Sequence, residues 1–310
     1  MNRRRFITST AVAGATLAAG CATSSLRFGG IVDTHTHFYD PGRPEGVPWP
    51  PADDPVLSRT VLPAEFESLA KPFGVIGTVV VEASPWVEDN QWLLELADQN
   101  PFLLGIVGNL KPGTPDFKTQ LRRFVQNRRF CGIRVGGDTL EAALAGGAAQ
   151  NDLRQLADSN LSLDLLIGPE QLPGAAQLGN AIPDLRIIVD HCANVPVGSP
   201  PPNLWIAGLS ACHYAPNVSM KVSGLVEGTG RRGGQAPTDL AYYRSVLDSL
   251  WATFGEDRLI YGSNWPVCLH FASYATVLAI VEEYFTAKSE RSAAKYFRRN
   301  AARVYQYIGP

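Results

Sequence analysis

The stretch "IVDTHTHFYD", residues 31–40, ends a short apolar run with a carboxylate and two imidazoles at alternate positions. In a β-strand, residues two apart point to the same face, so Asp33, His35 and His37 are predicted to share one side. The last of them would lie where the strand ends. A polar edge strand with solvated histidines is the alternative, because one His-x-His pattern carries little specificity.

The size and composition of the chain set broad limits. The chain has 310 residues, of which 45% are hydrophobic, which is enough for a large core in one α/β domain or two smaller ones. The formal net charge of −2 leaves no surplus of cations to neutralise phosphates, so we expect no nucleic-acid partner. No apolar run approaches the roughly 20 residues that a transmembrane helix needs. The expected partner is a small-molecule substrate.

The first residues, "MNRRRFITSTAVAGATLAAGC", resemble an export signal. They combine a basic start, a moderately apolar middle and small residues before a cysteine. The pair Arg3 and Arg4 resembles the twin-arginine pattern, which addresses folded proteins for export to the periplasm. A disordered basic tail is the weaker alternative. We therefore predict an exported, periplasmic protein.

Cys21 makes this protein a candidate lipoprotein with a lipid anchor, because it follows "LAAG" as in a bacterial lipoprotein cleavage site. The residue three positions before the cysteine is an alanine rather than the usual leucine, which leaves lipidation open. Residues 1–29 are predicted to be the export signal and a short linker. Residues 30–310 are predicted to form the folded domain.

Short, nearly continuous apolar runs recur along the folded part. Strands that are buried on both faces have this pattern, which is typical of parallel sheets. Eight such units in about 250 residues fit a closed barrel. The predicted strands are residues 30–37, 75–83, 102–110, 130–135, 162–168, 185–191, 218–224 and 259–266.

Amphipathic segments with helical periodicity alternate with these runs. Alternation of strand and helix gives either an open doubly wound sheet or a closed barrel. No glycine-rich phosphate-binding pattern follows the first strand, so the nucleotide-binding sheet loses its main support. We predict a single (β/α)8 TIM barrel with an extra C-terminal helix. Expected helices include residues 89–100, 151–160, 239–255, 274–285 and 289–308.

Polar residues gather at the carboxyl ends of the predicted strands, whereas the strand starts are almost all apolar or glycine. The active site of a TIM barrel is built at these ends and in the loops that follow them. The pattern therefore predicts one polar cavity at this end of the barrel. The residues concerned are His35, His37, Glu82, Asn109, Arg134, Asp164, Asp190, His191, Lys221, Ser263 and Asn264.

Some of these residues also have purely structural interpretations. Arg134 or Lys221 would pair with a barrel carboxylate such as Asp164 in an ion-pair network without chemistry. Asp33 would hydrogen-bond to a histidine on the side away from the substrate and fix the tautomer of that ring. Asn109 is expected to bond the backbone. Structural and functional interpretations of these four residues therefore stay open at this point.

The five histidines fall into two groups. His213 and His270 lie in or next to helical segments and are expected to be surface or packing residues. His35, His37 and His191 are all predicted at one end of one barrel. For these three the functional interpretation is favoured.

The chain resembles the amidohydrolase superfamily, whose barrels carry His-x-His on strand 1, a histidine on a later strand and an acidic residue that ends strand 8. More closely, it resembles the branch that includes 2-pyrone-4,6-dicarboxylate lactonase and lactonases of the L-fuconolactonase or L-rhamnonolactonase type. The resemblance implies a hydrolase that acts on ester bonds. It rests on the stretches "VDTHTHFYDP", "GIRV", "LDLLIGPEQLP", "IIVDHCAN", "MKVSGL", "DRLIYGSNWPV" and "NAARVYQY".

The sequence departs from this family at the end of strand 8. The family pattern there is most often Gly-Ser-Asp-Trp-Pro, in which the Asp takes a proton from the attacking water. Here the position is Asn264, an amide that exchanges hydrogen bonds but cannot act as a base. Either His191 or Glu82 takes that proton, or the reaction is not hydrolysis.

The resemblance also bears on metal binding. Some of the lactonases work without a metal, and their histidines and cations polarise the lactone carbonyl directly. Loss of the strand-8 carboxylate favours this mode, so no cofactor is expected to be required. The alternative is a single zinc ion on His35, His37 and His191, since a catalytic zinc site needs only three protein ligands.

Substrate contacts follow from the same interpretation. His35, His37, Arg134 and Lys221 are the available donors to a carbonyl oxygen that gains negative charge. Arg134 would also anchor an acidic substrate, because its fork matches a carboxylate in two bonds. Stacking of a sugar ring on Trp86 and Trp265 is expected, with plain packing as the alternative.

Three functions remain open on the sequence alone. The first is an exported hydrolase of a lactone or related cyclic ester, with a sugar lactone as the expected substrate and a role in carbohydrate metabolism. The second is an isomerase or decarboxylase-like enzyme, in which Asn264 only binds substrate. The third is a non-catalytic binding protein for a sugar acid. The sequence leaves the substrate and the oligomeric state open.

Overall fold

We describe a computed structural model of the chain, which covers residues 28–198, 200–307 and 309. The predicted signal and Cys21 fall in residues 1–27, outside the described residues, so their export and lipidation stay predictions. Within the described part, no helix combines the length and the apolar character needed to cross a membrane.

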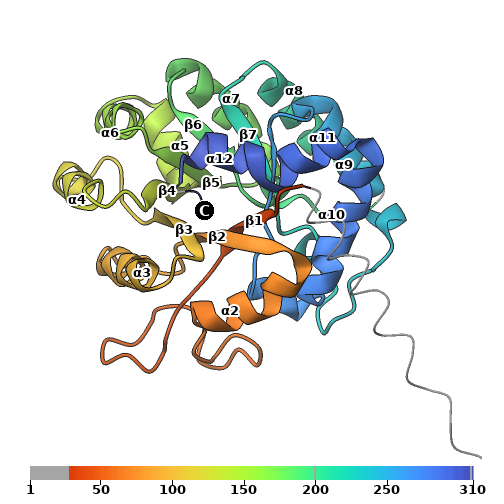
Figure 1. Cartoon of the computed structure of the whole chain (residues 1–310). Helices are drawn as coiled ribbons and strands as arrows, with labels where there is room; N and C mark the ends of the chain where they lie inside the picture. Colours follow the sequence, from red (N-terminus) through yellow and green to blue (C-terminus); the bar gives the residue numbers. More distant parts are fainter. Residues whose placement is uncertain (1–27, 199, 308, 310) are drawn as a thin grey trace, which may run out of the picture.

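Eight parallel strands form one sheet in the order β1 to β8, as in the predicted barrel (Figure 1). The sheet curls so that β8 returns to β1, where Thr36 bridges Trp265 and the His37 amide donates to the Trp265 carbonyl at 2.9 Å. All eight predicted strands are confirmed, and most end a few residues earlier than expected. Their bounds are β1 Ile31–Thr36, β2 Val75–Val81, β3 Leu103–Gly108, β4 Phe130–Gly136, β5 Ser162–Leu166, β6 Arg186–Val189, β7 Val218–Val222 and β8 Leu259–Tyr261.

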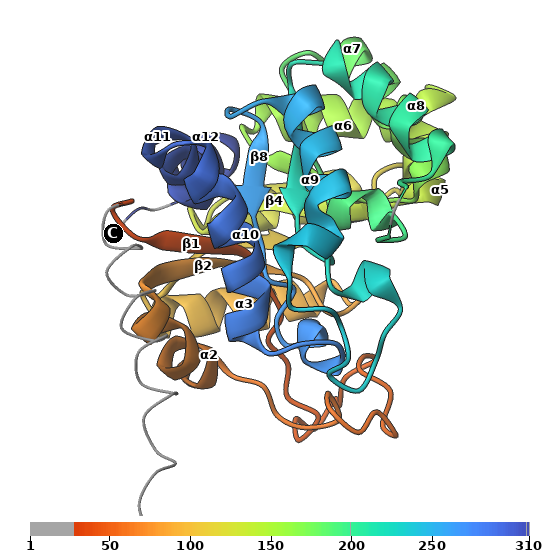
Figure 2. The same ribbon diagram turned by 90° about the vertical axis from the view of Figure 1, so that its right-hand side faces the viewer.

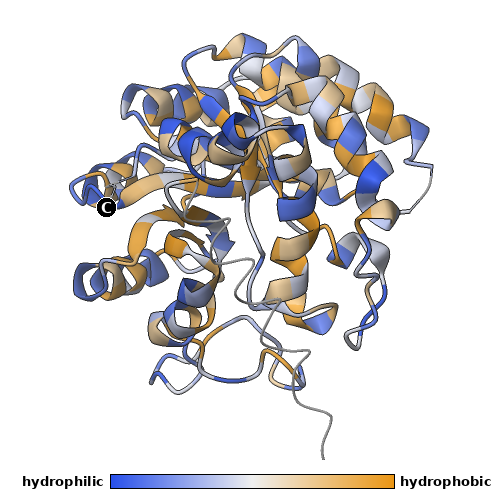
Figure 3. Ribbon diagram, turned by 45° about the vertical axis from the view of Figure 1, so that its right-hand side comes forward, coloured by the Kyte–Doolittle hydropathy of each residue, from blue (hydrophilic) through white to orange (hydrophobic). Residues whose placement is uncertain are grey.

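Helices surround the strands and cover their outer face with apolar side chains (Figures 2 and 3). Each strand is thus buried between the barrel interior and a helix, which explains the nearly unbroken apolar runs. The helices are α2 Pro63–Ala70, α3 Glu88–Gln99, α4 Phe117–Phe124, α5 Gly137–Leu144, α6 Ala148–Asp158, α7 Leu172–Ala181, α8 Asn203–His213, α9 Leu240–Phe254, α10 Tyr274–Lys288, α11 Glu290–Ala294 and α12 Asn300–Tyr305.

Local sequence signals set the ends of α9. The Asp239 side chain accepts from the Ala241 amide and caps the first turn. Gly255 follows the last residue with a φ of 62°, a conformation that glycine adopts without strain. The sequence therefore encodes both limits of this helix, close to the predicted 239–255.

The C-terminal segment closes the bottom of the barrel. The predicted single helix at 289–308 is observed as α11, a π-helical turn and α12. Val304 and Tyr305 of α12 join the apolar cluster inside the barrel, and the Arg186 Nε donates to the Val304 carbonyl at 2.7 Å. The opposite end of the barrel, at the carboxyl ends of the strands, remains available for a site.

Candidate active site

A cavity of about 760 Å³ lies at the carboxyl ends of the strands. Its size falls within the range of small-molecule sites. Its lining comes from the ends of the strands and from the loops that follow them, as the barrel architecture predicts. Among the lining residues are His37, Trp49, Asp54, Glu82, Asn109, Arg134, His191, Glu227, Arg232, Asn264, His270 and Phe271.

The three predicted imidazoles meet at the base of this cavity. The ring centroid of His35 lies 5.0 Å from that of His37 and 4.3 Å from that of His191. His37 and His191 line the cavity, whereas His35 is fully buried behind them. Burial lowers the pKa of His37 to about 3 and that of His191 to about 4, so both rings are neutral near pH 7. The predicted convergence is confirmed, and the catalytic roles of these residues stay predictions.

A left-handed turn at the end of β6 orients His191. The strand ends at Val189, and His191 follows with a φ of 54° rather than ending the strand as predicted. The Ser223 Oγ accepts from the His191 amide at 3.2 Å and lies 2.9 Å from Nδ1. In the tautomer in which the Ser223 hydroxyl donates to Nδ1, the proton of the neutral ring lies on Nε2.

Asp33 does not share a side with the imidazoles, which corrects the prediction. The pairing of β1 with β2 shifts in register between Asp33 and Thr36, and the Asp33 carboxyl interacts with the side chains of Ser263 and Tyr274. The Asp33 Oδ1 accepts from the backbone amides of His35 and Ser263, at 3.1 and 2.9 Å. Asp33 therefore shapes the backbone beside the site and does not fix a histidine tautomer.

Asn264 connects His37 to an acid that the sequence analysis did not identify. The Asn264 Oδ1 lies 3.2 Å from the His37 Nε2, and its Nδ2 donates to the Glu227 Oε1 at 2.9 Å. The other ring nitrogen of His37 lies 3.0 Å from the Val81 carbonyl oxygen. Burial raises the pKa of Glu227 to about 7. Glu227 was missed because it lies five residues beyond the end of β7, past the strand end where polar residues were sought.

Glu82 and Arg134 both line the cavity but are bound to each other. The Arg134 Nε donates to the Glu82 Oε1 at 2.8 Å, and its Nη2 donates to the Glu82 carbonyl at 2.7 Å. Two of the guanidinium nitrogens are therefore engaged by Glu82. This is the ion pair that the structural interpretation of Arg134 anticipated, with Glu82 in place of Asp164.

Lys221 does not reach the substrate cavity, which corrects its predicted binding role. It is fully buried inside the barrel, where its Nζ lies 2.6 Å from the Asp164 Oδ2 and 2.9 Å from the Asp190 Oδ1. The predicted pairing of Lys221 with Asp164 is therefore confirmed. Its ammonium group stabilises carboxylates below the site instead of a substrate.

The aromatic side chains of the cavity differ from those predicted. Trp265 is fully buried and packs against Phe66, with ring centroids 5.0 Å apart, whereas Trp86 is exposed and does not line the cavity. Trp265 therefore has no exposed face on which a sugar ring could stack, and Trp86 lies outside this lining. Trp49 and Phe271, from the loops after β1 and β8, line the cavity instead. Both residues lie in loops, outside the predicted strand ends from which the site residues were chosen.

The rim of the cavity joins three loops. His270, predicted as a surface or packing residue, lines the cavity, and its Nε2 lies 2.9 Å from the Asp54 Oδ2. The Arg232 guanidinium, in the glycine-rich segment after β7, approaches the same carboxylate at 3.9 Å. Figure 2 shows the loops after β1 and β7 side by side at this end. Asn109 bonds the backbone as expected, through its Nδ2 to the Ser84 carbonyl at 3.0 Å.

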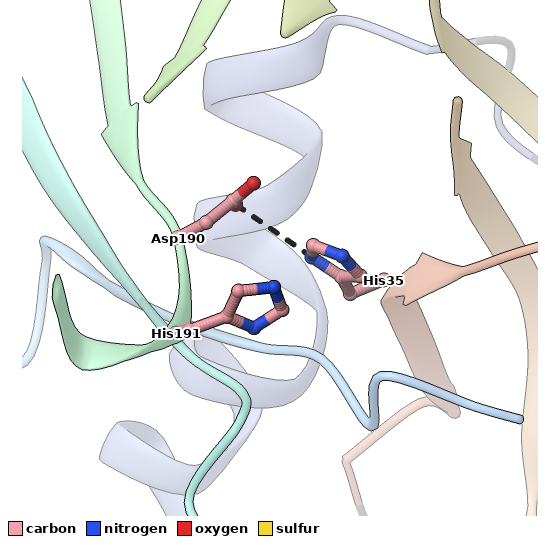
Figure 4. A group of neighbouring side chains, drawn as sticks. All are labelled: His35, Asp190 and His191. Atoms are coloured by element: carbon pink, nitrogen blue, oxygen red, sulfur yellow. Dashed lines mark ion pairs between the residues drawn. The ribbon is translucent and has the colours of Figure 1, made fainter. Parts of the chain in front are cut away.

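Three residues could hold a metal ion, namely His35, Asp190 and His191, and this set contains two of the three predicted ligands (Figure 4). The ligand atoms of the three residues lie within 4.8 Å of one another, and neither ring nitrogen of His35 has a hydrogen-bond partner. Two imidazole nitrogens and a carboxylate oxygen suit a catalytic zinc ion. His37 is unsuited because a backbone carbonyl and Asn264 occupy both of its nitrogens.

Known proteins share this fold and sequence pattern. The amidohydrolase family profile matches residues 32–307. An L-fucono-1,5-lactonase from Burkholderia ambifaria is 30% identical over 296 residues, which cover 90% of this chain and 96% of that protein. A zinc-bound amidohydrolase structure from Burkholderia multivorans is 26% identical with a TM-score of 0.81, and the match covers 89% of this chain and 99% of that one. A probable 2-pyrone-4,6-dicarboxylic acid hydrolase from Acinetobacter baumannii, 19% identical, shares the fold with a TM-score of 0.69 and covers 89% and 99% of the two chains.

Proposed function

The chain belongs to the amidohydrolase family, and on that premise we propose that this enzyme hydrolyses the ester ring of a neutral sugar lactone. The observation that carries the proposal is the cavity with two neutral imidazoles, His37 and His191, at its base. Hydrolysis of a lactone creates negative charge on the carbonyl oxygen, which preorganised donors stabilise. The B. ambifaria relative is a lactonase by name, and this agrees with the proposal.

Pairing of the charged groups in the cavity favours a neutral substrate over a dicarboxylate. Arg134 is bound to Glu82, and Arg232 approaches Asp54. Two carboxylates on a substrate would need cations that are free to bind them. Among the described lining residues, each arginine already has a carboxylate nearby. Hydroxyl groups of a sugar ring can instead exchange hydrogen bonds with these pairs.

His191 is the donor best placed for the carbonyl oxygen. Its amide and Nδ1 are both bound by Ser223, and when the Ser223 hydroxyl donates to Nδ1, Nε2 carries the ring proton and His191 lines the cavity with it. Neutral imidazole donates without releasing its proton near pH 7, because burial holds its pKa at about 4. The apolar faces of Trp49 and Phe271 would exclude water from the remainder of the bound sugar lactone.

A zinc ion on His35, Asp190 and His191 would supply Lewis-acid polarisation of the carbonyl in place of the hydrogen bond from His191, because it would take the Nε2 of that ring. Metal analysis of the purified protein, with activity measured before and after chelation, tests whether this ion is required. A metal content below stoichiometry with full activity after chelation would contradict a zinc requirement.

A panel of aldonolactones tests the reaction. We expect acid release, followed by titration at constant pH, for at least one neutral five- or six-membered sugar lactone, and little for a pyrone dicarboxylate. Product without acid release would point to an isomerase, and binding without turnover would point to a sugar-acid binding protein. Replacement of His191 by Ala should lower kcat by about 100-fold, because a donor to the oxyanion is lost.

Export of the enzyme is the second part of the proposal, and it rests on residues 1–29 alone. We expect the protein in the periplasmic fraction of its host, either free or held by a lipid on Cys21. Replacing both Arg3 and Arg4 by Lys should keep the protein in the cytoplasm if the twin-arginine pattern directs it. Equal export of this variant and the wild type would contradict the twin-arginine route.

A further inference from the structure

We propose that Glu227 is the general base that takes a proton from the attacking water, and that Asn264 is the residue that positions it. The inference rests on the proposed lactone hydrolysis. It assigns to Glu227 the proton transfer for which related barrels use an Asp at the end of β8, where this chain has Asn264. Neither Glu82 nor His191, the two candidates from the sequence, is needed for that step.

Glu227 reaches the cavity from the short 3-10 turn Glu227–Thr229, which follows β7. Its Oε1 accepts from Asn264, and its Oε2 has no hydrogen-bond partner although it is buried. A buried carboxylate oxygen without a partner is costly, so a bound group is expected there. A water molecule held between Oε2 and the lactone carbonyl would satisfy this oxygen.

Competing carboxylates in the cavity are already engaged. Glu82 holds Arg134, and Asp54 accepts from the backbone amides of Val56 and Leu57 and lies 2.9 Å from His270. A proton arriving on either acid would weaken these contacts. Glu227 has no cation within ion-pair distance among the described residues. Of the three lining carboxylates, it is therefore the one free to accept a proton.

An amide at position 264 suits a carboxylate that changes protonation during the reaction. In one orientation, Asn264 donates to ionised Glu227 and accepts from the His37 Nε2, so the Nδ1 of the neutral ring faces the Val81 carbonyl without a proton. In the reverse orientation, Asn264 accepts from protonated Glu227 and donates to the His37 Nε2, while the His37 Nδ1 donates to the Val81 carbonyl. An aspartate at this position would be a second negative charge beside Glu227 and would oppose its ionisation. The asparagine is thus consistent with a base on Glu227.

The surroundings of Glu227 tune it for work near neutral pH. Burial raises its pKa to about 7, where a general base is most effective. Its titratable neighbours are Cys192, Tyr243 and Cys268, and burial raises the pKa of each, so all three are neutral at this pH. Glu227, which contacts Asn264, is therefore the group in this environment that titrates near pH 7.

The chemical step balances without another reactant. Ionised Glu227 removes a proton from water as the water oxygen bonds to the lactone carbonyl carbon, and the carbonyl oxygen becomes negative. The tetrahedral intermediate then collapses and breaks the bond between the carbonyl carbon and the ring oxygen. Protonated Glu227 returns its proton to that leaving oxygen. The products are the open-chain hydroxy acid and the regenerated carboxylate.

Replacing Glu227 by Gln tests the inference, because the amide keeps the shape and can still accept from Asn264. The substrate is the lactone that the wild-type protein hydrolyses best in the panel. We expect kcat to fall by about 10²- to 10⁴-fold, with KM changed by only a few fold. The rise of kcat/KM through about pH 7 should also disappear. The matched control is Glu170→Gln, an exposed glutamate after β5 that does not line the cavity, and it should retain wild-type kinetics.

Each outcome decides between the two proposals. Glu227 is supported as the base if Glu227→Gln loses kcat, shows no rise of kcat/KM near pH 7 and keeps the circular dichroism spectrum of the wild type. Wild-type kcat in this variant would overturn the inference and leave lactone hydrolysis intact. A wild-type protein that hydrolyses no lactone would overturn the proposed function, and the inference with it. If Glu227→Gln folds poorly, Glu227→Asp serves instead, and an unchanged kcat with its shortened carboxylate would equally overturn the inference.

Discussion

Two polar clusters lie in the same barrel and use similar residue types in opposite ways. The interior cluster comprises Asp164, Asp190, Lys221 and Tyr305. The Lys221 Nζ lies within 2.9 Å of both carboxylates, and the Tyr305 hydroxyl donates to the Asp164 Oδ2 at 2.7 Å. The cavity cluster comprises His37, Asn264 and Glu227, and it keeps one carboxylate oxygen without a partner.

The difference shows that residue type and strand position do not by themselves indicate a catalytic role. One ammonium group cannot neutralise two ionised acids, so the pKa values of Asp164 and Asp190 shift in opposite directions. Burial raises the pKa of Asp164 to about 7, whereas Lys221 outweighs burial at Asp190 and holds its pKa well below the usual range. The interior cluster is therefore charge-balanced, and stability is its expected contribution, while Asp190 is also one of the three candidate metal ligands. The Asp164 Oδ1 of the interior cluster also lacks a hydrogen-bond partner, but only Glu227 lines the cavity, where a substrate or water can reach its free oxygen.

The largest effect is expected from Lys221→Met, which removes the only cation found in the interior cluster. It leaves two buried acids without a counter-ion, and breaking a buried pair costs about 3–5 kcal/mol of unfolding free energy. Urea unfolding should show this loss. The control is Lys118→Met at an exposed position, which should stay within about 0.5 kcal/mol of wild type. Equal stability of Lys221→Met and wild type would mean that the interior ion pairs do not stabilise the barrel.

A pH-dependent gain in stability is expected from Glu227→Gln in the cavity cluster. Burial raises the pKa of Glu227 from 4.5 to about 7, so the folded state holds this proton more tightly than the unfolded chain does. Its contribution to stability is complete below about pH 4.5 and is lost as the pH rises through 7. Gln does not titrate, so the stability of the variant relative to wild type should rise by up to about 3 kcal/mol between about pH 5 and pH 8. A difference that is constant over this range would contradict the raised pKa.

Restoring an acid at position 264 should rescue the cavity cluster. In the Glu227→Gln background, Asn264→Asp places a carboxylate at the end of β8 without a second acid beside it. We expect kcat to recover at least about tenfold, roughly 1.4 kcal/mol of the activation barrier. The same substitution in the wild-type background should give no such gain, because two neighbouring carboxylates do not both ionise freely. Recovery in neither background would indicate that position 264 cannot deliver a proton acceptor to the water.

The smallest effect is expected from Tyr305→Phe, which removes one hydrogen bond from the interior cluster and keeps the ring in the core. The loss should be about 1 kcal/mol of unfolding free energy. Activity should be unchanged, because Tyr305 lies at the opposite end of the barrel from the cavity and contacts Asp164 only from below. A large loss of kcat without loss of stability would show that the two clusters are coupled.

Much of the barrel could be predicted because its signals are local. The apolar runs of buried parallel strands, the helical periodicity between them and the stop at Gly255 are all carried by neighbouring residues. The convergence of His35, His37 and His191 then follows from the architecture, since every strand ends at the same rim. The prediction failed at Asp33, whose side chain accepts from the backbone amides of His35 and Ser263 beside an irregular part of the β1–β2 pairing.

Contacts between loops could not be predicted from the same signals. Trp49, Glu227 and His270 lie several residues beyond their strands, and only the path of each loop brings them to the cavity. Trp265 and Lys221 show the reverse, since both lie at or near strand ends yet point into the packed interior. Residue type indicates which chemistry is available, but not whether a side chain points into the cavity or into the packed interior.

The sequence by itself determined a (β/α)8 barrel with histidines at its rim and an amide in place of the expected strand-8 acid, because strand burial and helical period are properties of adjacent residues. Only the tertiary structure decided which polar groups satisfy one another and which remain open to a ligand. Lys221 is engaged by Asp164 and Asp190, whereas Glu227 meets Asn264 and retains a free oxygen. This distinction depends on distances between residues far apart in the chain, and local sequence patterns contain no such distances.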